Sequence, residues 1–161
     1  MILGMSVSTF TLVHVLLSLV GIFAGLLVVY GFLKGRLIDG LNGVFLVTTI
    51  LTSVTGFLFH SAQFGPPHFV GIISLVLLGF AVAALYAFNL AGPWRLIYAA
   101  TATLSLYLNV FVGVVQAFQK ISFLQPLAPT QSEPPFAVAQ GLVLVIFLAL
   151  TVLASKRLRA R

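Results

Sequence analysis

The chain has 161 residues, of which 61 % are hydrophobic and only 6 % are charged, and it contains no cysteine. A soluble domain carries about a quarter charged residues, because water must solvate its surface, so this composition excludes a free-standing soluble enzyme and a disordered tail. The net charge of +6 comes from only eight basic residues, which do not form a nucleic-acid-binding face. The lack of cysteine excludes disulfides, thiolate-bound zinc and iron–sulfur clusters. We therefore expect an integral membrane protein.

Five apolar stretches reach the length of about 20 residues that a helix needs to cross a bilayer. In chain order they are residues 8–33, 41–60, 68–88, 96–118 and 136–155. Backbone that faces lipid must bond internally, which continuous spans achieve as helices. The sequence predicts an all-α fold, a single transmembrane domain over residues 1–161 built as a five-helix bundle.

Turn-forming residues separate these stretches. Gly35 and Gly40 follow the first, Gly65-Pro66-Pro67 lies between the second and third, and Gly92-Pro93 precedes the fourth. The longest loop is rich in proline and ends in Gln131-Ser132-Glu133-Pro134-Pro135. Polar residues followed by proline are typical of a helix start, so we expect the last helix to begin there.

Lysine and arginine are distributed asymmetrically over the predicted loops. With five spans, all but Lys120 fall on one side, namely Lys34, Arg36, Arg95, Lys156, Arg157, Arg159 and Arg161. Because cytoplasmic loops carry an excess of basic residues, we expect the N-terminus outside and the C-terminus in the cytoplasm. The segment Met1–Val7 has no charge, so we do not expect a cleaved signal peptide.

Small and polar residues recur at helical spacing in three of the stretches. They are His14, Ser18, Gly21 and Gly25 in the first, Thr48, Thr52, Gly56 and His60 in the second, and Thr101, Ser105, Asn109, Gly113, Gln116 and Lys120 in the fourth. Such stripes predict faces that avoid lipid. Close packing explains most of them, but the amide of Asn109 is expected to bond across the bundle or to contact a ligand.

The strongest polar groups are predicted to gather at the outer boundary of the membrane. All three histidines lie there, with Lys120 and one of the two acids, Glu133. The predicted ligand-binding residues are His14, Asn109, Gln116, Lys120, Gln131 and Glu133. Three imidazoles suit copper or zinc, so a second hypothesis is a metal site of His14, His60 and His68.

Three further interpretations of this cluster stay open. Haem b bound by His14 and a second histidine is one, since axial histidines on different helices hold haem in membrane bundles. A quinone bound by a histidine and a polar partner is another. The third is a structural lid, in which Lys120 and Glu133 form an ion pair over the mouth of the bundle and His14 bonds a backbone carbonyl.

Four segments and His14 carry a resemblance. The segments are Leu106-Tyr-Leu-Asn-Val-Phe-Val112, Val115-Gln-Ala-Phe-Gln-Lys120, Thr52-Ser-Val-Thr-Gly-Phe57 and, most specifically, Ala128-Pro-Thr-Gln-Ser-Glu-Pro-Pro-Phe136. With them the chain resembles a family of small bacterial inner-membrane proteins of uncharacterised activity. The resemblance implies a multi-pass protein of a bacterial inner membrane. It implies no activity.

Catalytic patterns are missing from the sequence. Asp39 and Glu133 are the only acids and are predicted on opposite sides, so hydrolysis by paired carboxylates is excluded. We therefore expect a non-enzymatic protein with a polar pocket at the outer leaflet, a binding module or an accessory subunit of a larger membrane complex. The alternative is a redox protein centred on His14 that binds haem b, quinone or a metal. Expected partners are the lipid bilayer, other membrane subunits or further copies of the chain, and not nucleic acid.

Overall fold

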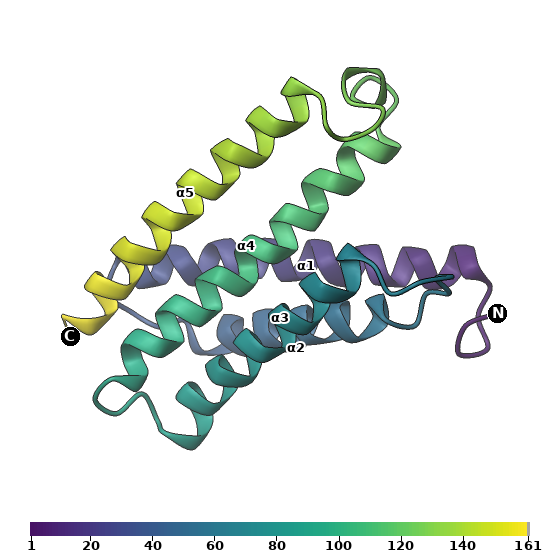
Figure 1. Cartoon of the computed structure of the whole chain (residues 1–161). Helices are drawn as coiled ribbons and strands as arrows, with labels where there is room; N and C mark the ends of the chain where they lie inside the picture. Colours follow the sequence, from purple (N-terminus) through teal and green to yellow (C-terminus); the bar gives the residue numbers. More distant parts are fainter. Residues whose placement is uncertain (161) are drawn as a thin grey trace.

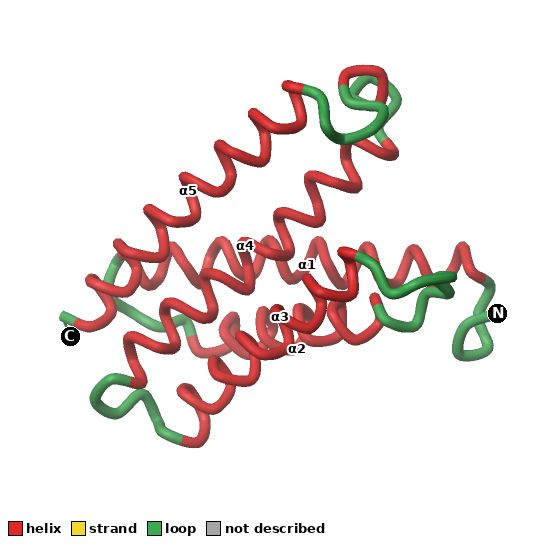
Figure 2. The backbone as a smooth tube through the Cα atoms, viewed as in Figure 1, coloured by secondary structure: helices red, strands yellow, loops and turns green. Residues whose placement is uncertain are grey.

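The computed structural model describes residues 1–160 and is all-helical, with no β-strand among them. The elements are α1 (Val7–Leu33), α2 (Asp39–Gly56), α3 (Pro66–Val82), a π-helical turn (Ala83–Ala87), α4 (Trp94–Lys120), a 3-10 turn (Gln125–Leu127) and α5 (Pro134–Arg159). Figures 1 and 2 show these helices packed into one bundle and joined by loops at its two ends. The predicted all-α five-helix bundle is confirmed.

The connections alternate between the two ends of the bundle. One end carries the N-terminal residues 1–6 and the loops 57–65 and 121–133, and we call it the histidine end because His60 lies there and His14 and His68 lie near it. The other carries the loops 34–38 and 88–93 and the end of α5 (Figure 1), and we call it the basic end. Every lysine and arginine of the described residues except Lys120 lies at the basic end.

Four helices are long and apolar enough to cross a membrane. They are α1, α3 continued by its π-helical turn to Ala87, α4 and α5. Helix α2 has 18 residues, fewer than each of these four spans, and contains Asp39 and Asn42 in its first turn. The bundle is thus of the membrane type, while a fifth crossing by α2 and the direction of the termini stay predictions.

Two helix boundaries are informative. Helix α2 ends at Gly56 because the N–H groups of Phe57 and Leu58 bond three residues back, to Val54 and Thr55; His60 is therefore in the loop rather than at the helix end. Helix α5 begins at Pro134 with Glu133 as its N-cap residue, so the predicted helix start is confirmed. Proline suits this position because the first turn needs no N–H donor.

The apolar core occupies the basic half of the bundle. Its members come from the second halves of α1, α3 and α5, from the first halves of α2 and α4, and from the connection between α3 and α4. A side chain at Gly25 would place its Cβ 2.6 Å from Leu106 and 2.9 Å from Phe45, so glycine there lets α1 approach α2 and α4. The buried Tyr98 hydroxyl donates to the buried Asn42 side chain across this core.

The histidine half is packed less tightly. In Figure 1 the α4–α5 hairpin leans away from α1 toward the loop that joins α4 and α5. Helices α1 and α2 remain in contact with each other, and α3 packs against both α2 and α4. These helices and the half of α4 nearer the histidine end line the cavity described next.

Candidate functional site

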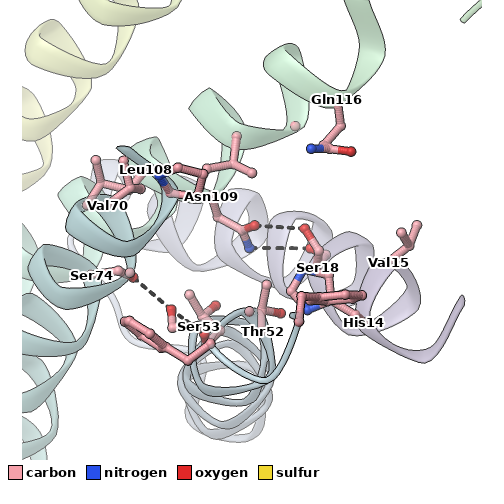
Figure 3. A pocket seen from close by; sticks show the side chains of 18 of the residues that line it. His14, Val15, Ser18, Thr52, Ser53, Val70, Ser74, Leu108, Asn109 and Gln116 are labelled. Atoms are coloured by element: carbon pink, nitrogen blue, oxygen red, sulfur yellow. Dashed lines mark hydrogen bonds between the residues drawn. The ribbon is translucent and has the colours of Figure 1, made fainter. Parts of the chain in front are cut away.

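A cavity of about 610 Å³ lies between α1, α2, α3 and α4 in the histidine half. Figure 3 shows side chains from all four helices turned toward it. Its polar lining consists of Thr11, His14, Ser18, Thr49, Thr52, Ser53, Ser61, His68, Ser74, Asn109, Gln116 and Lys120. The remaining walls are mainly apolar, and no carboxylate lines the cavity.

His14 on α1 is held by a single hydrogen bond from its ring. Its Nδ1 lies 2.7 Å from the Thr55 hydroxyl oxygen on α2, and that hydroxyl donates its only hydrogen to the Leu51 carbonyl at 2.7 Å. When that hydrogen is on the Leu51 carbonyl, the Thr55 oxygen accepts the Nδ1–H of His14, because a hydroxyl has one hydrogen to give. In the neutral ring that arrangement leaves the lone pair on Nε2, and the free nitrogen of His14 is then an acceptor.

The His14 ring is also fixed by packing. Phe59 meets it edge to face with ring centroids 5.2 Å apart, and a Cβ built on Gly56 would lie 3.7 Å from its Cε1 atom. The ring is half-buried. These contacts fix the orientation of the ring and of its free Nε2 atom. The expected bond from His14 to a backbone carbonyl is not formed, and the ring bonds to Thr55 instead.

Asn109 on α4 bonds across the bundle, as predicted. Its Oδ1 accepts the Ser18 hydroxyl of α1 at 2.8 Å, and its Nδ2 makes a longer bond of 3.4 Å to the Ser18 carbonyl. Both dashed contacts are drawn in Figure 3. Asn109 is buried and still has one amide hydrogen uncommitted, so it ties α1 to α4 and keeps a donor at the cavity wall.

Two hydroxyl groups on α2 complete the inner wall. Ser53 shares a hydrogen bond of 3.0 Å with Ser74 on α3. The Thr49 hydroxyl is fully buried and has no conventional partner, but it faces the backbone of Gly21, where a Cβ would lie only 3.0 Å away. A Cα–H group is a weak donor to such an oxygen, which explains why a glycine is needed at this crossing of α1 and α2.

The three histidines do not form one metal site. No group of three His, Cys, Asp or Glu side chains placed to hold a metal ion occurs among residues 1–160. His68 lines the cavity, but its Nδ1 accepts the Gly65 N–H at 3.0 Å and its Nε2 bonds Ser61 at 3.1 Å. His60 is exposed in the loop after α2 and is absent from the cavity lining. The predicted trio is therefore divided between different environments.

Gln116 and Lys120 lie where the cavity meets the histidine end. Both line it from the last two turns of α4, and Lys120 is the only lysine or arginine that does so. Gln116 makes one weak side-chain contact, 3.5 Å to Gln119. This edge of the cavity therefore offers an ammonium group and a nearly unengaged amide.

Gln131 and Glu133 are outside the cavity. Gln131 donates to the Val115 carbonyl at 3.1 Å, and Glu133 accepts from the hydroxyl and N–H of Thr130 and from the N–H of Ser132. Glu133 is thus bonded within its own loop rather than to Lys120, and the proposed lid does not form through that ion pair. Desolvation opposes its charge, but these hydrogen bonds outweigh it and hold the pKa of Glu133 below the usual value.

The structure therefore groups four of the six predicted ligand-binding residues, His14, Asn109, Gln116 and Lys120, around one cavity. It adds residues that the sequence did not single out. Thr55 orients His14 and Thr49 faces Gly21, and both lie beside the polar stripe of α2 rather than on it. Spacing from Thr48 and Thr52 would have suggested Thr55, but nothing in a threonine-rich helix identifies its partner.

Comparison of the chain with protein-family models, with curated proteins and with solved structures gave no match. The function is therefore argued from the cavity itself.

Proposed function

We propose that this protein is a membrane-embedded binding module that takes a small amphiphilic molecule into the cavity beside His14. The observation that carries the proposal is the free Nε2 of a fixed His14 ring on the wall of a cavity of about 610 Å³. Protein sites for small molecules commonly measure about 300–1,000 Å³ and combine apolar walls with a few polar groups. This cavity has both properties.

The polar groups define the ligand that suits the cavity. The neutral His14 ring offers an acceptor, whereas Asn109, Gln116 and Lys120 offer donors. A head group that carries a hydroxyl beside a carbonyl or another acceptor satisfies both kinds. A cationic head group is disfavoured, because Lys120 repels it and no carboxylate lines the cavity to compensate.

A stability measurement tests this proposal, because a ligand that binds only the folded state raises its stability. We expect fractions of a bacterial membrane extract to raise the unfolding temperature of the chain in neutral detergent. Gly113→Phe fills the cavity from α4, whereas Gly141→Phe adds the same side chain on an exposed face of α5. The shift should vanish in the first variant and persist in the second. Equal shifts in both, or none in the parent, would contradict the proposal.

Among the redox alternatives, the His14 geometry favours a quinol. A quinol hydroxyl can donate to Nε2 of His14 while its ring lies against the apolar walls. Haem b is less well supported, because both ring nitrogens of His68 are already engaged and His60 is outside the cavity. The distinguishing experiment is titration with a short-chain quinol and with its dimethyl ether, which lacks the donor. Tighter binding of the quinol, lost in His14→Leu, supports this assignment; equal binding of the two contradicts it.

We further infer a place in a bacterial inner membrane, with the N-terminus outside and α2 as the fifth crossing. The separation of the basic residues from the histidine end supports this orientation, and the resemblance noted above supports the source. A reporter fused after Arg159 tests it, since activity only in the cytoplasm is expected. A role as an accessory subunit requires a stable complex, and purification from native membranes as a partner-free species would contradict that role.

A further inference from the structure

A second feature lies at the opposite end of the bundle, far from the cavity. The loop after α1 and the end of α5 border one hollow, which is lined by Leu33, Lys34, Gly35, Arg157 and Ala160. Lys34 and Arg157 are more than a hundred residues apart in sequence and both are exposed. The packing of α5 against α1 thus brings two cations to a shared surface depression.

No acid of the described chain balances these two cations. Glu133 is at the histidine end and is bonded to Thr130 and Ser132. Asp39 begins α2, and the structure contains no ion pair between it and Lys34 or Arg157. Two like charges beside one hollow repel each other, and an anion placed between them relieves that repulsion. The hollow is therefore suited to an anion.

The residue types point to a phosphate group. The guanidinium of Arg157 can present two parallel N–H donors to phosphate oxygens, and the Lys34 ammonium can add a compact positive charge. Lys34 already lies over the ring of Tyr30, with Nζ 5.6 Å from the centroid, and Tyr30 is exposed on α1. An exposed tyrosine and lysine at the end of a membrane-type helix are typical of the headgroup region.

We propose that this hollow binds the phosphate group of an anionic lipid headgroup. Basic residues beside membrane helices attract anionic lipids, but the pairing of Lys34 with Arg157 predicts a localised site rather than a diffuse one. The competing structural role is interaction with the helix dipole, which favours cations at helix C-termini. The two roles differ in what they do to lipid binding.

The test uses the full chain in a neutral detergent, with bound lipid counted by native mass spectrometry. Phosphatidylglycerol should bind more tightly than phosphatidylcholine. The double variant Lys34→Gln/Arg157→Gln should weaken phosphatidylglycerol binding about tenfold, whereas Arg36→Gln/Arg159→Gln should change it less than about twofold. Both variants remove two positive charges from the same two segments, and only the first pair lines the hollow.

Three results would overturn the proposal. Equal weakening in the two double variants would assign lipid binding to the diffuse charge of the basic end. Unchanged binding together with lower thermal stability in the first variant would assign Lys34 and Arg157 to the helix dipoles. Displacement of phosphatidylglycerol by millimolar inorganic phosphate would assign the hollow to free phosphate rather than to a lipid.

Discussion

The Thr55 hydroxyl oxygen lies 2.7 Å from Nδ1 of His14 and 2.7 Å from the carbonyl oxygen of Leu51. Thr55 thus lies between a backbone carbonyl of α2 and the ring of a histidine on α1. With the Thr55 hydrogen on that carbonyl, the neutral His14 ring carries its lone pair on Nε2. Histidines that bind ligands are commonly fixed in this way through their other nitrogen.

Replacing Thr55 should release the His14 ring. We expect Thr55→Val to give a mixture of the two neutral tautomers, whereas the parent protein shows protonation at Nδ1 only. The check is ¹⁵N nuclear magnetic resonance of labelled histidine, with His60 and His68 assigned by substitution. Thr52→Val is the matched control, because the Thr52 hydroxyl bonds only its own helix at Thr48. A parent spectrum with protonated Nε2 would refute the tautomer assignment.

The Ser18–Asn109 bond should contribute measurably to helix association. A double-mutant cycle of Ser18→Ala and Asn109→Leu is expected to give a coupling free energy of about 1 kcal/mol, in the range known for polar contacts between membrane helices. The measurement is reversible unfolding in mixed micelles. Pairing Ser18→Ala with Thr103→Val should give a coupling near zero, because Thr103 bonds the Ala99 carbonyl of its own helix. Equal coupling free energies in both cycles would contradict a specific contribution of the Ser18–Asn109 hydrogen bond to stability.

Gly25 should be intolerant of even one added methyl group. Its Cβ would lie 2.6 Å from a methyl group of Leu106 and 2.9 Å from the ring of Phe45, so Gly25→Ala must displace these buried side chains or push α1 away from α2 and α4. Overpacking of this kind costs about 1–3 kcal/mol. Gly79→Ala on α3 meets no atom within 4 Å and should be neutral or slightly stabilising, since alanine favours helix. Unfolding free energies of the two variants decide this, and equal values would contradict the packing described.

Glu133 should make the stability of the chain depend on pH. Its folded-state pKa is lowered from 4.5, so its hydrogen bonds stabilise the fold fully above that value and are lost as the pH falls through the lower folded-state pKa. Glu133→Gln should remove this contribution and flatten the acid side of the profile of unfolding temperature against pH. Asp39→Asn serves as the control. A parent profile that the Glu133 substitution leaves unchanged would contradict the loop bonding.

The long apolar stretches and the turn-forming glycine and proline residues between them were sufficient to predict an all-helical bundle. The long apolar stretches, Pro134 at a helix start and the stripe through Ser18, Gly21 and Gly25 are local patterns, and helical periodicity translates them directly into buried faces. The hydrogen bond of Asn109 across the bundle was also predictable. Asn109 lies on the polar stripe of α4, and its amide could not be satisfied within α4 alone.

The parts that sequence could not predict depend on which side chains meet. Glu133 is hydrogen-bonded by the residues that precede it in its own loop, so it does not pair with Lys120, which lies at the cavity edge. His60 and His68 are close in sequence, but the end of α2 at Gly56 leaves the first in solvent-exposed loop and the second on α3. Grouping by predicted depth in the membrane brought these residues together, whereas loop geometry separates them.

The most direct test of the cavity is to identify what it holds. The chain is purified in a mild neutral detergent, extracted with organic solvent, and the extract is analysed by mass spectrometry beside Gly113→Phe and Gly141→Phe. We predict one small amphiphile in amounts close to one per chain in the parent protein and in Gly141→Phe, and its loss from Gly113→Phe when that variant keeps its helical content. Extracts that contain only bulk lipid, or the same molecule in all three proteins, would contradict a binding function for the cavity beside His14.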